Sequence, residues 1–212
     1  MTESRTVIDS QSVHKPQIVY DIGSRRYINI GKHCTLRCQF CPKHNGSWQV
    51  HDYDLELARL PSTKTIQIAL GNLDSVEEVV FCGFSEPTLR LPILLSVAHW
   101  VKQQNKPVRV NTDGLGNLVH KRNILPELAA CVDALSISLN AQNEAIYNRH
   151  CQPQLPGSYH SLLEFLKLAP NYIGNVTATA IDGLDGVDIP ACADMTQKSN
   201  AQSRIRYLDQ VG

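Results

Sequence analysis

The stretch that decides the predicted fold is GKHCTLRCQFCP, residues 31–42. Its cysteines, Cys34, Cys38 and Cys41, follow the spacing C-x3-C-x2-C, and an aromatic residue stands just before the third. Iron–sulfur clusters are normally held by four thiolates. Three thiolates this close together can hold three irons of a cubane cluster, which leaves the fourth iron open. The stretch therefore predicts a cluster that binds a further molecule with free donor atoms.

Two other structures are compatible with this spacing. Residues i, i+4 and i+7 share one face of a helix, so the cysteines could form a buried stripe. Pro42 disfavours that, because the residue before a proline is driven out of the helical region. Zinc is the stronger alternative, since Cys38 and Cys41 form a CxxC pair and His33 and His44 lie nearby. The second hypothesis is thus a zinc-stabilised binding module with the ligands Cys34, Cys38, Cys41 and His44.

The composition predicts a globular, cytoplasmic protein. The 212 residues suit one domain of good size or two small ones. Lys+Arg and Asp+Glu both total 20, so there is no basic excess that would indicate nucleic acid. Seven cysteines in this length are not disulfide-dense, and with three of them clustered they favour a reducing compartment.

The ends and the apolar runs indicate no membrane segment. The first 16 residues are polar and lack the apolar core of a signal peptide, so we expect 1–16 to be a disordered tail and 17–212 to form one core domain. The most apolar run, Leu91 to Val101, contains His99 and is too short to cross a bilayer.

Apolar runs and turn residues predict alternating strands and helices. We expect a hairpin over 17–30 with its turn at Gly23-Ser24, and helices with Ser62 as a cap and Pro190 in a first turn. The alternation indicates a parallel six-stranded sheet with helices outside, an α/β partial (β/α)6 barrel preceded by the N-terminal β-hairpin. The other strands are expected over 79–83, 108–112, 134–139, 176–181 and 204–208, and the helices over 52–60, 63–73, 91–105, 124–131, 143–150, 158–168 and 189–199.

Polar and glycine residues follow successive predicted strands, at the carboxyl ends where barrels of this kind place their chemistry. Gly83 would let a ligand approach the backbone, and Glu86 could pair with an ammonium group. Asn111, Ser138 and Asn140 have the donors and acceptors that ribose hydroxyls need. Each has an ordinary alternative as a turn former, but together they predict a nucleotide-like ligand.

These motifs resemble those of a known family. The cysteine stretch resembles the signature of the radical S-adenosylmethionine (radical SAM) superfamily, and FCGFSEPTLR, residues 81–90, resembles its glycine–glutamate motif. VNTDGLGNL (110–118), ILPELAACVDALSISLN (124–140) and IYNRHCQP (146–153) extend the resemblance. The set is most similar to the TatD-associated radical SAM proteins, small members linked to TatD-type hydrolases.

The resemblance implies an enzyme. The amino and carboxylate groups of S-adenosylmethionine would chelate the open iron of its [4Fe-4S] cluster. An electron from the cluster would then cleave the sulfonium and leave a 5'-deoxyadenosyl radical that removes hydrogen from an unknown substrate. A reducing donor such as flavodoxin or ferredoxin is implied, and a TatD-type hydrolase is a possible partner. The implied metal ligands are Cys34, Cys38 and Cys41, and the implied cofactor-binding residues are Gly83, Phe84, Ser85, Glu86, Asn111, Ser138 and Asn140.

The sequence departs from the family pattern at three places. Ser85 stands where a second glycine is common, Asp113 where asparagine is frequent, and residues 31–33 where threonine and asparagine are expected. A catalytically degenerate SAM-binding protein is therefore a third hypothesis.

The remaining cysteines and Trp48 have no assigned role. Cys82 and Cys131 are expected in the core, and Cys192 has no CxxC partner. Cys151 is expected at a packed helix end, with a role as a hydrogen donor in the site as the alternative. Trp48 could shield the cluster or merely pack against its loop.

Overall fold

The computed structural model describes residues 17–208, and its main element is a seven-stranded sheet with the strand order β1-β2-β5-β6-β7-β8-β9. β1 pairs antiparallel with β2, and every other neighbouring pair is parallel. The strands are β1 Val19–Ile22, β2 Arg25–Asn29, β5 Glu78–Cys82, β6 Val108–Thr112, β7 Ala134–Ser138, β8 Asn175–Asp182 and β9 Gln202–Tyr207.

The predicted α/β fold with a mostly parallel sheet is confirmed, but the strand count differs. Six strands were expected in the sheet, and it has seven, because β1 is hydrogen bonded to β2 in the same sheet instead of preceding it. The tail expected over residues 1–16 lies outside the described residues.

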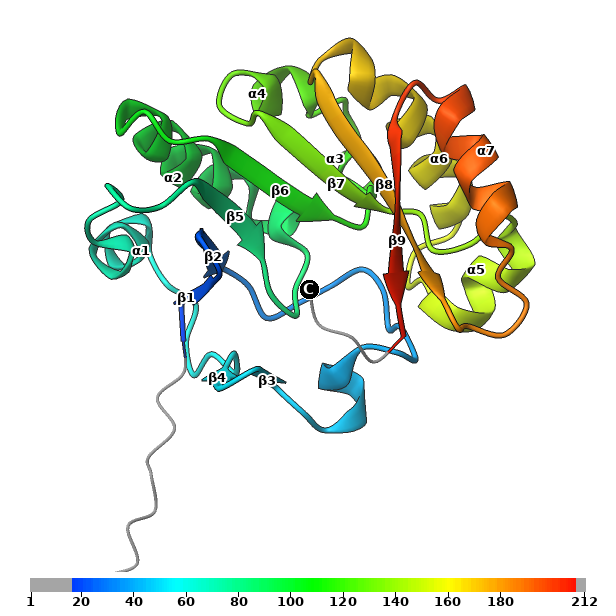
Figure 1. Ribbon diagram of the computed structural model, residues 1–212, viewed down its shortest axis with the longest axis horizontal. Coiled ribbons are helices and arrows are strands. Elements are labelled where there is room, and N and C mark those ends of the chain that lie inside the picture. The colour runs from blue at the N-terminus through cyan, green and yellow to red at the C-terminus, as the bar shows by residue number, and fades with distance from the viewer. Residues whose placement is uncertain (1–16, 209–212) are drawn as a thin grey trace, which may run out of the picture.

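The helices lie on the outer side of the sheet, and the arrowheads of β5 to β9 point toward the segment that follows β2 (Figure 1). Ser62 caps the first helix as predicted, since its Oγ accepts from the backbone N–H of Thr65 at 3.2 Å. The helices are α1 Thr63–Leu70, α2 Leu91–Gln103, α3 Gly116–His120, α4 Leu125–Ala129, α5 Glu144–Cys151, α6 Ser158–Leu168 and α7 Ile189–Lys198, with the 3₁₀ turns Pro42–Asn45, Pro87–Arg90 and Ala169–Asn171.

The helix predicted over 52–60 is wrong. This region holds the second strand of a two-stranded sheet, β3 Gln49–Val50 with β4 Tyr53–Asp54, followed by extended chain. Leu55 and Leu57 are buried while Glu56 between them is exposed. That alternation has the period of an extended chain, because successive side chains of a strand point to opposite sides.

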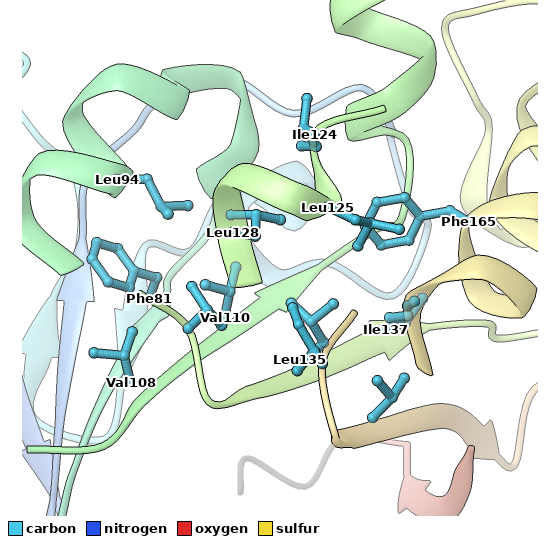
Figure 2. Packing of buried hydrophobic residues seen from close by; sticks show 14 of the residues in the cluster. Phe81, Leu94, Val108, Val110, Ile124, Leu125, Leu128, Leu135, Ile137 and Phe165 are labelled. Atoms are coloured by element: carbon cyan, nitrogen blue, oxygen red, sulfur yellow. The ribbon is translucent and has the colours of Figure 1, made fainter. Parts of the chain in front are cut away.

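The main core fills the space between the sheet and the helices. Figure 2 shows Phe81 of β5 and Val110 of β6 facing Leu94 of α2 and Leu128 of α4, and Phe165 of α6 near Ile137 of β7. A smaller cluster, formed by Tyr20, Val50 and Leu55, packs between β1 and the β3–β4 sheet. Within residues 17–208 no helix has the length and apolarity needed to cross a bilayer.

Candidate active site

A cavity of about 440 Å³ lies at the carboxyl ends of the parallel strands. It brings together every site residue expected from the sequence, although they come from four separate segments of the chain. These residues are Cys34, Cys38, Cys41, Gly83, Phe84, Ser85, Glu86, Asn111, Ser138 and Asn140.

The cysteine loop crosses from the end of β2 to the end of α5. The backbone N–H of Arg37 donates to the carbonyl of Cys151 at 3.0 Å, and that of Gln39 donates to His150 at 2.9 Å. Leu36 forms an isolated antiparallel bridge with Pro153. The loop therefore continues from β2 and is hydrogen bonded to residues 150–153, which fixes the position of its cysteines.

The three thiols lie in a largely desolvated environment. Burial raises the pKa of Cys34 and of Cys41. A hydrogen bond with the neighbouring Cys151, together with burial, raises the pKa of Cys38. Thiolates in this position need a bound cation to balance their charge, because desolvation disfavours the ionised form. Over residues 17–208, no three His, Cys, Asp or Glu side chains converge closely enough to hold one metal ion.

Gly83 occupies a conformation that other residues rarely adopt. Its φ is 107°, and a Cβ there would come within 2.7 Å of Asn29 Oδ1. Glycine therefore brings the backbone after β5 close to the cavity without a clash.

The serine at position 85 is accommodated by its surroundings. Ser85 is not among the residues with positive φ, so its backbone does not require glycine. A Cβ on Gly31 would lie 2.7 Å from Ser85 Oγ, so the glycine before the cysteines leaves room for this hydroxyl. The Oγ is buried and has no hydrogen-bond partner among the described residues. It is thus a polar atom at the cavity that a ligand could satisfy.

Glu86 is buried at the wall of the cavity, and both of its carboxylate oxygens accept hydrogen bonds. Its Oε1 accepts from the backbone N–H and the hydroxyl of Thr88 and from the hydroxyl of Thr112, at 3.0, 2.6 and 2.8 Å. Its Oε2 accepts from the backbone N–H of Asp113 at 2.7 Å. Burial and the nearby charge of Asp113 raise the pKa of Glu86.

Asp113 is the second buried acid of the site. Its carboxylate accepts from the hydroxyl of Thr35 and from the backbone N–H of Leu115, and it lies 3.8 Å from Cys34 Sγ. Burial raises its pKa. A pair of carboxylates with raised pKa values favours a bound cation, since the cation's field stabilises their ionised forms.

The three predicted ribose-binding residues differ in how free they are. Asn111 is already engaged, because its Nδ2 donates to Cys82 Sγ at 3.2 Å and its Oδ1 accepts from Arg109 at 3.0 Å. The Nδ2 of Asn140 donates to Cys151 Sγ at 3.6 Å. Ser138 is half-buried at the end of β7. Ser138 and Asn140 therefore have more capacity for a ligand than Asn111.

One expectation about the other residues changes, and the position of Trp48 is defined. Cys82 was expected in the core, but it lines the cavity and accepts the hydrogen bond from Asn111, since its position on β5 faces inward. Trp48 packs edge-on against Phe84, with ring centroids 6.3 Å apart, and Lys43 lies 5.3 Å from the centroid of its ring. Cys131, Cys151 and Cys192 are buried.

Some residues at the site were not found from the sequence. Lys43 Nζ donates to the carbonyls of Lys32 at 2.8 Å and Phe84 at 3.4 Å, which ties the cysteine loop to the segment after β5. Arg109, Arg204 and Arg206 line the cavity. The two-residue spacing on the last strand was the available signal for Arg204 and Arg206.

Comparison with known proteins gives one family match. A family model described as the radical SAM superfamily matches residues 28–195. No curated protein matches this chain.

Several solved structures share the fold. TYW1 with a lysine-pyruvate adduct bound has a TM-score of 0.60 at 15% identity, over 89% of this chain and 66% of that one. A radical SAM methyltransferase from Sphaerobacter thermophilus has a TM-score of 0.59 at 13% identity, over 89% of this chain and 68% of that one. SuiB from Streptococcus suis, bound to the precursor peptide SuiA, has a TM-score of 0.65 at 14% identity, over 86% of this chain and 39% of that one. This chain thus spans between 39% and 68% of the length of these neighbours.

Proposed function

The chain belongs to the radical SAM superfamily, and from that membership we propose that it is an enzyme that cleaves S-adenosylmethionine reductively. The family uses a [4Fe-4S] cluster and S-adenosylmethionine, which when bound supply a 5'-deoxyadenosyl radical for hydrogen abstraction. The observation that carries the proposal is the convergence of the three cysteines and seven cofactor-binding candidates on one cavity.

Cys34, Cys38 and Cys41 are the proposed cluster ligands. In a cubane each thiolate binds a different iron, so the sulfurs need not converge on one point as they must for zinc. Their thiol groups are suitable ligands for an iron–sulfur cluster. The backbone contacts of the loop with residues 150–153 hold the cysteines in position. The desolvated surroundings raise the pKa values of the thiols, so cluster assembly has to displace their protons.

The segment from Gly83 to Glu86 is proposed to bind the methionine part of S-adenosylmethionine. Gly83 opens the backbone to the ligand, and the buried Ser85 hydroxyl offers an unused hydrogen-bonding group. An ammonium group near Glu86 and Asp113 would stabilise their ionised forms. Ser138 and Asn140 are proposed to bind the ribose hydroxyls.

The finer assignments are also proposals. Within the superfamily we place the chain with the TatD-associated proteins on the motifs of residues 81–90, 110–118, 124–140 and 146–153. Residues 17–212 would form the catalytic domain of a cytoplasmic enzyme, reduced by a flavodoxin or ferredoxin, with a TatD-type hydrolase as a possible partner. Turnover with reduced flavodoxin in place of dithionite would test the choice of electron donor.

Anaerobic reconstitution tests the cluster. Incubation with iron and sulfide should load about four irons per chain, the content of a single cubane, and dithionite with S-adenosylmethionine should then release 5'-deoxyadenosine. Replacing Cys34, Cys38 or Cys41 by Ser should lower the iron content and abolish the product. Cys192→Ser is the matched control, because Cys192 is buried and does not line the cavity.

Three outcomes would contradict the proposal. The zinc module would be supported if the chain bound one zinc with no iron chromophore and lost that zinc when His44 is replaced. His44 is a suitable ligand to test because it also lines the cavity. A fully loaded chain that binds S-adenosylmethionine without cleaving it would indicate a degenerate member. Equal iron content in the Cys38→Ser and Cys192→Ser variants would show that Cys38 is not a cluster ligand, and the ligand assignment would be wrong.

A further inference from the structure

The β8–β9 side of the cavity carries positive charge. Arg204 and Arg206 stand two residues apart on β9, so they share one face of the strand, and both line the cavity. Their register partners on β8, Thr179 and Ile181, line it as well. The arginines therefore belong to the inward-facing row of the sheet.

The Arg206 guanidinium has no acidic partner among residues 17–208. The residue is half-buried, and its side chain forms no hydrogen bond or ion pair with any residue from 17 to 208. Arg109, the third arginine of the cavity, differs because its Nε donates to Glu78 at 3.0 Å and its Nη1 to Asn111 at 3.0 Å. A guanidinium removed from bulk water gains most from an anionic partner.

The acids of the cavity do not supply that partner. Glu86 is held by Thr88, Thr112 and the backbone of Asp113. Asp113 in turn is held by the cysteine loop and its own turn. Within the described part of the chain neither carboxylate forms an ion pair with an arginine. The cavity thus has an acidic region suited to a cation and a basic region suited to an anion.

We propose that Arg206, assisted by Arg204, binds an anionic group of the substrate, either a carboxylate or a phosphate. The planar guanidinium presents paired donors that match both groups. Thr179, the register partner of Arg204, and Ser136 on β7 are small and polar and line the same cavity, which suits a hydrophilic molecule. This inference rests on the proposed function, because it assigns the substrate of the same site.

Two other roles for the arginines give different results. Charged residues on an edge strand can prevent pairing with another sheet, in which case no anion would bind at a defined site. Alternatively, the arginines could bind the carboxylate of S-adenosylmethionine itself, and an anion would then compete with that molecule.

Titration calorimetry on the full chain tests the proposal without turnover. Inorganic phosphate and malonate are titrated separately at constant ionic strength, with and without S-adenosylmethionine and in the absence of reductant. We expect one saturable site for at least one probe, unaffected by S-adenosylmethionine. Arg206→Gln should weaken anion binding about tenfold, the loss expected for one charged hydrogen bond, and Arg206→Lys should weaken it less because the charge remains. The probe that binds more tightly identifies a phosphate or a carboxylate as the recognised group.

Arg122→Gln is the matched control, because Arg122 is exposed and paired with Glu127 outside the cavity; its anion affinity should not change. Equal affinity in Arg206→Gln, competition with S-adenosylmethionine, or no saturable binding would overturn the inference. If the anion binds as expected but no 5'-deoxyadenosine forms under reduction, the proposed function fails and the anion site remains.

Discussion

Asn140, two residues after the end of β7, combines a backbone role with a side-chain role. Its φ is 61°, in the left-handed region, and its N–H donates to the carbonyl of Thr179 at 3.0 Å. Asparagine tolerates this region better than most residues, and only glycine does so without strain. Because the residue is buried and lines the cavity, substitutions can separate the two roles.

We expect Asn140→Ala to lower the free energy of unfolding by at most about 1–2 kcal/mol, the full cost of the left-handed conformation, because alanine lacks the short polar side chain that lets asparagine tolerate this region. Asn140→Gly should lower it less, because glycine adopts this φ. Both variants lack the amide, so both should bind S-adenosylmethionine more weakly in equilibrium dialysis of the reconstituted chain. Unchanged affinity in Asn140→Gly would show that the amide does not contact the ligand.

The sequence predicts some site residues much better than others. Cysteines at C-x3-C-x2-C spacing are few and chemically specific, so Cys34, Cys38 and Cys41 are found without a fold. Arg206 is different, because an arginine on a strand can face solvent or cavity, and only the pairing of Ile181 with Arg206 fixes its direction. The hydrogen-bond partners of Asn111 likewise depend on the structure: Cys82, which accepts from Asn111, lies on the neighbouring strand β5, so the pairing of β5 with β6 brings the two together.

Lys43 joins the cysteine loop to the segment after β5, and the proposed cofactors need both. It follows the cysteines, donates to the backbone of residues 32 and 84, and lies against Trp48. Both carbonyls would lose a donor if the ammonium were removed, and unsatisfied buried acceptors are costly.

Lys43→Met should therefore loosen the cysteine loop without unfolding the sheet. We expect faster amide hydrogen exchange over residues 31–46 and a shorter lifetime of the reconstituted cluster in air. Lys106→Met is the matched control, since Lys106 Nζ also donates to a backbone carbonyl, that of Asp74 at 2.9 Å, away from the cavity. If both variants exchange alike over this loop, Lys43 does not hold it.

Helices and strands could be predicted from the sequence where the apolar pattern repeats over enough residues. α6 begins and ends where expected, at Ser158 and Leu168. The error over 52–60 arose because the alternation from Tyr53 to Leu57 is only five residues long, and a short apolar pattern also fits a helix. α3 was missed because five residues after a glycine turn carry too little periodicity.

The cavity is coupled to the hydrophobic core between the sheet and the helices. Cys34, Cys38 and Phe40 pack against the same hydrophobic cluster that joins the sheet to the helices. The cysteine loop also connects the end of β2 with the end of α5. Because these contacts link segments far apart in sequence, unfolding of the chain must release whatever the cysteines hold.

Cluster loading should therefore raise the stability of the whole chain. A ligand at 100 times its Kd stabilises the folded state by about 2.7 kcal/mol when it does not bind the unfolded chain. For about 200 residues each kcal/mol raises Tm by roughly 2–4 °C, so calorimetry should find the reconstituted chain melting about 5–10 °C above the cluster-free chain. The variant with Ser at positions 34, 38 and 41 should show no such difference. Four bound irons with no rise in Tm would mean that the cluster lies on a segment that unfolds independently of the sheet, and the coupling inferred from the packing of Cys34 and Cys38 would then be wrong.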